Sequence, residues 1–188
     1  RLVGGDAGTN TSPTTSVATA FAGSGKVVIE PFGTSFTAEQ TLANVTMAST
    51  ITGLTVGKTG NTQAVTLPAS YSIAGDLNLI GGAVTVSAAQ TTTNSGIITV
   101  TGSGAFSSTA ALTSSGNTSI TAPDITVGSA ISSGGTSGVL LKANNMAVNA
   151  AVTATSGSGA VTIAPVIADR QIDLGASTTT TTRLVLEN

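Results

Sequence analysis

Short apolar runs recur along the chain, and turn-forming residues separate them. Within many runs apolar and hydroxyl side chains alternate, as in Val84-Thr85-Val86. Alternation with a period of two places successive side chains on opposite faces of a β-strand. One series of runs is Leu77–Ile80, Ile97–Val100, Thr118–Thr121, Val139–Leu141 and Val161–Ile163, and a second is Val84–Val86, Ile125–Val127 and Met146–Val148. The pattern predicts an all-β chain.

Turn-forming residues repeat about every 21 positions. One series recurs at intervals of 21, and the other closes loops rich in Ser, Thr, Asn and Gly at intervals of 20, 22 and 21. The first series is Gly60, Gly81, Gly102, Pro123, Asn144 and Pro165, and the second is Gly96, Gly116, Gly138 and Gly159. A fixed period of this length indicates a repeat architecture. We assign these ten residues as structural turn positions.

The loops fit a coil that stacks each turn on the previous one, whereas a meander of hairpins needs tight two-residue turns. We predict a parallel β-helix, or β-solenoid, with about 21 residues and three strands per turn, the third side being less apolar. The predicted solenoid spans residues 23–188 and is most regular at 77–176, with three or four weaker turns before Leu77. Residues 1–22 are predicted to be a linker or an irregular first turn.

Composition excludes several classes of function. Hydrophobic residues make up 40% of the chain and charged residues only 7%, which is unlike a disordered polymer. The chain has no cysteine, so it forms neither disulfides nor thiolate metal sites. Six scattered Lys and Arg residues argue against nucleic-acid binding, which needs clustered cations. No apolar run approaches the ~20 residues of a transmembrane helix.

Four segments resemble sequences of the large filamentous-haemagglutinin-like exoproteins of Gram-negative bacteria. They are Gly23–Thr37 (GSGKVVIEPFGTSFT), Gly53–Leu67 (GLTVGKTGNTQAVTL), Ala168–Ser177 (ADRQIDLGAS) and Arg183–Asn188 (RLVLEN). The resemblance implies a right-handed parallel β-helix within a very long exported chain. It also implies a role in attachment, aggregation, biofilm formation or motility on surfaces, and it brings no catalytic residues. The secretion and anchoring domains of that family have no counterpart in these segments.

The densest group of charges is Asp169, Arg170 and Asp173. In a β-helical lyase or pectinase, carboxylates and a basic residue on one face perform acid–base chemistry. Such enzymes place acids on neighbouring turns, so we interpret this group as a solvated turn with a weak local ion pair. Asp6 and Asp76 lie in Gly-containing loops but stand alone, whereas calcium needs six or more oxygen ligands. We expect no metal and no cofactor.

Two surface features bear on binding. The aromatic residues lack the 21-residue register of a sugar-binding stripe; they are Phe21, Phe32, Phe36, Tyr71 and Phe106. A flat outward Thr ladder is typical of ice-binding solenoids, and the candidate file on the first strand is Asn78, Thr99, Ser119, Leu140 and Thr162. Leu140 interrupts this file, so ice binding is the weakest alternative. The acceptor motifs for N-glycosylation at Asn10, Asn44 and Asn117 are expected by chance in this composition.

The sequence therefore predicts a non-catalytic structural or adhesive module, a stiff spacer or fibre segment, of a large secreted protein at the bacterial cell surface. Its expected partners are further solenoid turns of the same larger chain or neighbouring copies, together with surface glycans or host and bacterial surfaces. Nucleic acid is not an expected partner. The alternative from another class is a carbohydrate-binding or polysaccharide-degrading β-helix.

Overall fold

The chain winds into a stack of parallel strands. The computed structural model describes residues 2–4, 19–168, 171–174 and 183–187, and the side chains of residues 20–168. Within these residues every regular element is a strand, and all strand pairs are parallel. The prediction of an all-β parallel solenoid is confirmed.

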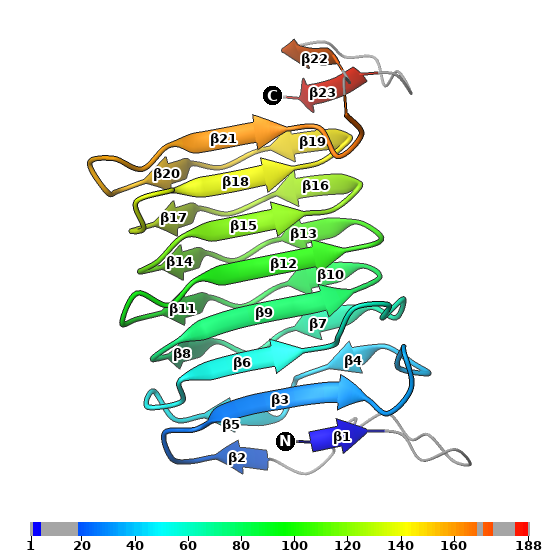
Figure 1. The fold of residues 1–188 in the computed structure, drawn as a ribbon, viewed down its shortest axis with the longest axis vertical. Coiled ribbons are helices and arrows are strands. Elements are labelled where there is room, and N and C mark those ends of the chain that lie inside the picture. The colour runs from blue at the N-terminus through cyan, green and yellow to red at the C-terminus, as the bar shows by residue number, and fades with distance from the viewer. Residues whose placement is uncertain (1, 5–18, 169–170, 175–182, 188) are drawn as a thin grey trace.

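The strands form three sides of the coil (Figure 1). The first side consists of β1 (Leu2–Gly4), β3 (Lys26–Pro31), β6 (Gly53–Val56), β9 (Asp76–Gly81), β12 (Ile98–Gly102), β15 (Thr118–Thr121), β18 (Val139–Lys142) and β21 (Val161–Ala164). The second side consists of β4 (Gln40–Thr41), β7 (Val65–Leu67), β10 (Val84–Val86), β13 (Phe106–Ser108), β16 (Asp124–Val127), β19 (Asn145–Val148), β23 (Arg183–Glu187) and β22 (Gln171–Leu174). The third side consists of β8 (Tyr71–Ile73), β11 (Gln90–Thr92), β14 (Leu112–Ser114), β17 (Ile131–Ser133) and β20 (Val152–Ala154), preceded by the separate pair β2 (Thr19–Phe21) and β5 (Val45–Met47).

Six successive turns contain one strand from each side, from β3–β4–β5 to β18–β19–β20. In Figure 1 the near strands of the first side run from left to right, and the chain returns behind them from right to left. Each circuit also lies closer to the C-terminal end than the one before it. The coil is therefore right-handed.

The length of a turn varies along the coil. On the first side, successive strands from β3 to β21 are offset by 27, 23, 21, 20, 21 and 22 residues. Among the described residues two complete turns precede β9, with β1 and β2 before them, and these early turns carry longer loops. The predicted number of three or four early turns stays a prediction. The segment predicted as a linker or irregular first turn contains β1, which pairs with β3, and β2, which pairs with β5; residues 5–18 lie outside the described residues.

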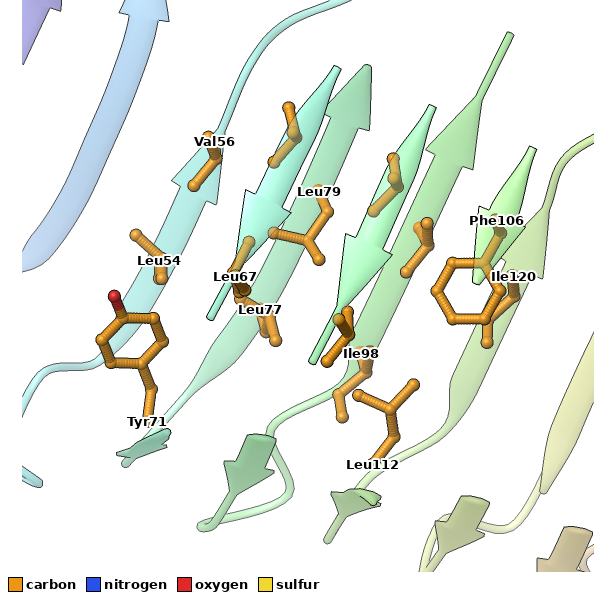
Figure 2. Close-up of a cluster of buried hydrophobic side chains, with 14 of the residues drawn as sticks. Leu54, Val56, Leu67, Tyr71, Leu77, Leu79, Ile98, Phe106, Leu112 and Ile120 are labelled. Carbon is orange, nitrogen blue, oxygen red and sulfur yellow. The ribbon is translucent and has the colours of Figure 1, made fainter. Parts of the chain in front are cut away.

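Aliphatic side chains from all three sides fill the interior (Figure 2). Corresponding inward positions of successive turns lie next to each other, since the ladders are parallel and in register. One such file on the first side is Val56, Leu79, Val100, Ile120 and Leu141, whose members are all at most 1% exposed. Each turn therefore buries its apolar face against the turns above and below it.

Hydroxyl side chains point inward at one corner of the coil, after the third side. The hydroxyls of Thr92 and Ser114 donate to the carbonyls of Gly96 and Gly116 at 2.6 and 2.7 Å. Ser133 donates to the carbonyls of Gly116 and Gly138 at 2.8 and 2.9 Å. Buried hydroxyls are tolerated when they are hydrogen-bonded, and these ones hold the glycine-containing loops in place.

Leu79 tests the assignment of inward and outward faces. We expect L79A to lower the free energy of unfolding by about 2–5 kcal/mol, because it leaves a cavity between Val56 and Val100. The control N78A changes the neighbouring outward side chain and should stay within about 0.5 kcal/mol of the parent. Urea unfolding followed by circular dichroism measures both variants. Equal losses of unfolding free energy in L79A and N78A would contradict the assignment of Leu79 to the inward face.

Tyr71 lies where the third side is interrupted. No ladder joins β5 to β8, and the Tyr71 hydroxyl donates to the carbonyl of Leu42 at 2.8 Å across this break. The side chain is only 4% exposed, and burial raises the pKa of Tyr71 to about 12. The folded chain therefore binds this proton more tightly than the unfolded chain, whose tyrosine has a pKa of about 10.

Raising the pH should consequently destabilise the fold through Tyr71. Its contribution is complete below pH ~10 and is lost as the pH rises through the folded-state pKa, because the unfolded state releases the proton first. We expect the free energy of unfolding of Y71F to fall less between pH ~10 and ~12 than that of the parent. Tyr71 is the only tyrosine and the chain has no tryptophan, so tyrosinate absorbance follows the titration directly. A folded-state midpoint at the ordinary value would refute the burial argument.

Candidate functional site

The predicted outward file on the first side is in register. Strand pairing aligns Asn78 with Thr99, Thr99 with Ser119, Ser119 with Leu140 and Leu140 with Thr162. These five side chains are exposed or half-buried. The alignment is confirmed, and Leu140 interrupts the file as the sequence indicates.

The third side carries an outward file without such an interruption. The second side carries one that extends over five turns before Ala147 follows Thr126. The sequence analysis missed both files. On the second side the aligned residues are Thr41, Thr66, Thr85, Ser107 and Thr126. On the third side they are Ser72, Thr91, Thr113, Ser132 and Thr153. Every member is the outward residue of a strand two to four residues long. Aligning the short runs of the sequence with one another would have revealed the recurring Ser or Thr. Their hydroxyl and methyl groups make a regular surface. On the second side the Glu39 carboxylate accepts hydrogen bonds from Thr66 and Thr41 at 2.6 and 3.3 Å.

The predicted turn positions lie within two residues of a strand end, except Gly60, which lies in the loop four residues after β6. Gly81 and Gly102 pair in register, and the amides of Asn144 and Gly116 donate to the carbonyls of Pro123 and Gly96 at 2.7 and 2.8 Å. Other successive members of the first series of turn positions are out of register by one or two residues. They are 21 residues apart, whereas the paired strands beside them are offset by 23, 20 and 22 residues. The displaced neighbours are Gly60 with Gly81, Gly102 with Pro123, and Asn144 with Pro165.

Gly138 marks the tightest of these corners. It has a φ of +70°, and its amide donates to the carbonyl of Gly135 at 3.0 Å. A Cβ at this position would lie 2.1 Å from the carbonyl oxygen of Ala160 in the next turn. Gly159 precedes that residue in the loop of the next turn. The corner therefore requires glycine for both its conformation and its close approach.

A hollow of about 190 Å³ opens at the corner between the first and second sides. It is lined by Thr59, Gly60, Asn61, Thr62, Ile80, Gly81, Thr101 and Ser103. None of these side chains carries a charge, so the hollow offers hydrogen bonding without acid–base chemistry.

Asn61 organises this corner. It is 3% exposed, and its Oδ1 accepts hydrogen bonds from Ser35 Oγ and from the amides of Phe36 and Gln63 at 3.0 to 3.2 Å. Its Nδ2 donates to the carbonyl of Ile80 at 2.9 Å. One side chain thus ties three successive turns together, which is a structural role.

The acids whose side chains the structure describes are dispersed. Glu30 lies in β3, Glu39 precedes β4, Asp76 begins β9 and Asp124 begins β16. Among the described residues no two of them occupy corresponding positions of neighbouring turns, and no group of three potential metal ligands is found. Asp76 Oδ1 accepts from the Ile97 amide at 3.1 Å, which is a structural use of the side chain.

Two predicted charge features lie beyond the described side chains. Asp169, Arg170 and Asp6 lie outside the described residues. Asp173 belongs to β22, of which only the backbone is described. The expectation that this group forms a solvated turn therefore remains a prediction.

The aromatic side chains form no outward stripe in the described part of the chain. Phe36, Tyr71 and Phe106 are buried, Phe21 is half-buried and Phe32 is 73% exposed. At the acceptor motifs, Asn117 accepts a hydrogen bond from the Ser137 amide at 3.0 Å, and Asn44 is exposed. Asn10 lies outside the described residues. The aromatic rings therefore serve mainly the core.

Comparisons with protein-family models, curated proteins and solved structures find no match. In the part of the chain that the structure describes, no helix has the length and apolarity to cross a membrane. The site must therefore be interpreted from its own geometry, which consists of outward files rich in Ser and Thr and a hollow lined by uncharged side chains on a stacked scaffold.

Gly138 provides a test of the corner geometry. We expect G138A to lower the free energy of unfolding by about 1–3 kcal/mol or more, because the alanine adopts a strained conformation and its Cβ meets Ala160. The matched control is G157A, since a Cβ there has no neighbour within 4 Å. Thermal unfolding of the two variants measures the difference. Equal stability would show that the loop relaxes away from Ala160.

Proposed function

We propose that this chain is a structural and adhesive segment of a large secreted protein at the bacterial cell surface, without enzymatic activity. The observation that carries the proposal is the continuous stack of six three-stranded turns around one apolar core. Backbone hydrogen bonds between turns and buried inward files favour a rod that resists bending. The outward surface is left free for contacts.

The composition of that surface supports an adhesive role. The second- and third-side files present hydroxyl and methyl groups at the ~4.8 Å spacing of neighbouring strands. The four segments similar to filamentous-haemagglutinin-like exoproteins favour surface attachment and the extracellular location. Surface glycans and the surfaces of host or bacterial cells are the proposed targets.

A second candidate is ice binding, which the uninterrupted third-side file and the five-turn second-side file favour more than the first-side file does. A polysaccharide-degrading role has weaker support, since the described acids do not meet on neighbouring turns. A carbohydrate-binding role without chemistry falls within the adhesive proposal, with the hydroxyl files in place of aromatic rings.

Display of the chain on a non-adherent bacterium through an unrelated outer-membrane anchor tests adhesion. We expect attachment to glass, to bacterial cells and to host cells to rise several-fold over cells that display the anchor alone. A triple variant with T66K, T85K and T126K alters the second-side file but not the core, and should reduce attachment. Circular dichroism of the purified triple variant controls for folding.

Other results would redirect the assignment. Attachment no better than that of the anchor alone would contradict the adhesive role. Growth of ice crystals into faceted shapes in the presence of the purified chain would favour ice binding over adhesion as the function. Release of reducing sugars from a panel of polysaccharides would contradict the absence of enzymatic activity.

A further inference from the structure

Two corner loops are longer than the repeat requires. Between the first and second sides, residues 32–39 join β3 to β4 and residues 57–64 join β6 to β7. Figure 1 shows both loops at the same edge of the stack. In the next four turns two or three residues are enough at this corner, namely 82–83, 103–105, 122–123 and 143–144. Insertions in a repeat fold gather on one face, which is often the binding face.

The second long loop and the two corners that follow it enclose the hollow. Residues 59–62 of the loop form one wall, Ile80 and Gly81 come from the next turn, and Thr101 and Ser103 come from the turn after that. Strand pairing places Ile80 beside Thr101. The hollow therefore lies where a long corner is followed by two short ones.

Hydrogen bonds hold the long loop in place before any ligand arrives. In addition to the contacts of buried Asn61, the hydroxyls of Ser35 and Thr62 share a hydrogen bond of 3.2 Å. The Thr62 amide also donates to Ser35 Oγ at 3.0 Å, and the Asn61 amide donates to the carbonyl of Lys58 at 3.0 Å. The two long loops thus brace each other. A preorganised site loses less conformational entropy when it binds a ligand.

Three hydroxyls in the hollow are available to a ligand. Those of Thr59, Thr101 and Ser103 form no hydrogen bond with any described residue. A hydroxyl can donate one hydrogen bond and accept two. Beside them the half-buried, outward side chain of Ile80 supplies an apolar contact. This combination fits a polyhydroxylated ring, because the ring has hydroxyls that donate and accept and C–H groups that are apolar.

A charged ligand finds no partner in the hollow, since none of the lining side chains carries a charge. Lys58 precedes the lining residues, but its Nζ lies 3.5 Å from the carbonyl oxygen of Phe32, which belongs to the preceding turn. An ion would lose hydration there without gaining an opposite charge. The volume of about 190 Å³ is below the ~300–1,000 Å³ of pockets that enclose drug-sized ligands, so the hollow accommodates one ring.

We propose that this hollow binds one neutral sugar unit of a surface glycan, through the hydroxyls of Thr59, Thr101 and Ser103 and an apolar contact with Ile80. The inference deepens the proposed function, since it rests on the adhesive role for the source of the glycan and assigns the site and the class of sugar. The site is separate from the outward files of the second and third sides.

Nuclear magnetic resonance of the ¹⁵N-labelled chain tests the site directly. Glucose, galactose and mannose are titrated one at a time, and each is compared with its uronate. We expect at least one neutral sugar to shift the amide resonances of Thr59, Gly60 and Thr101 saturably, while those of the third side stay unchanged. The uronate of the bound sugar should bind at least ten-fold more weakly, because its carboxylate meets no cation.

Thr101 and Thr99 provide a matched pair of variants, since both point outward from β12 and only Thr101 lines the hollow. T101L fills the hollow and removes a hydroxyl, so it should weaken sugar binding at least ten-fold. T99L should bind like the parent, and leucine already occurs in its file at Leu140. Circular dichroism controls for folding. If T101L is destabilised, T59L repeats the test from the exposed loop.

Four outcomes would overturn the inference: no saturable shift with any of the three sugars, shifts confined to residues away from the hollow, equal binding of the uronate, or equal binding by T101L and T99L. The display assay separates this inference from the proposed function. Attachment of cells without sugar binding would overturn the inference and leave the adhesive role intact. Sugar binding without attachment would support the site and contradict the adhesive role.

Discussion

The structure depends on hydrogen bonding between the backbones of successive turns. A single turn of about 21 residues buries a few aliphatic side chains, each contributing roughly 1.5–3 kcal/mol, against roughly 1–2 kcal/mol per residue for ordering the backbone. Pairing with the turns above and below satisfies the backbone groups of the strands and also of the corners. The amides of Leu77 and Leu112, for example, donate to the carbonyls of Ile97 and Ala130 in the following turns. Stability is therefore a property of the stack.

Parallel pairing also determines which residues each position accepts. An inward residue meets its counterpart one turn away, so aliphatic side chains follow aliphatic ones in most of the core files. Buried Gln90 and Ser108 interrupt one file on the third side and one on the second. Inward hydroxyls gather at the corner after the third side, where Thr92, Ser114 and Ser133 donate to the carbonyls of the glycine-containing loops. Ser108 lies inward on the second side, and its buried hydroxyl has no hydrogen-bond partner among the described residues. The apolar core excludes charged side chains, and the pairing between turns does not require them at outward positions. A chain with 7% charged residues is consistent with this constraint.

Much of the fold was predictable because the repeat is local. The period of 21 residues, the strand positions after Leu77 and the alignment of Asn78 with Thr99 follow from alternation and turn residues. The early turns were harder to predict from the sequence, because their offsets of 27 and 23 residues depart from the 21-residue repeat. The break at Tyr71 and the pairing of β22 through β23 depend on contacts between distant residues, which no local pattern records. The second- and third-side files were missed because their strands were aligned only by the structure.

The pairing that stabilises the interior also leaves strand edges at the two ends of the described stack. Inside the stack each first-side strand pairs with a strand on either side, whereas β21 pairs with β18 alone among the described strands, and its inward Val161 is 41% exposed. A compact sheet protein blunts such edges with charges, prolines or bulges. Here Pro165 follows β21 directly, but it lies after the strand and leaves the edge of Val161–Ala164 open. A parallel solenoid repeats along its axis, so a further turn would cover this edge with the same pairing and the same inward file. Extension along the axis is therefore the natural use of the fold.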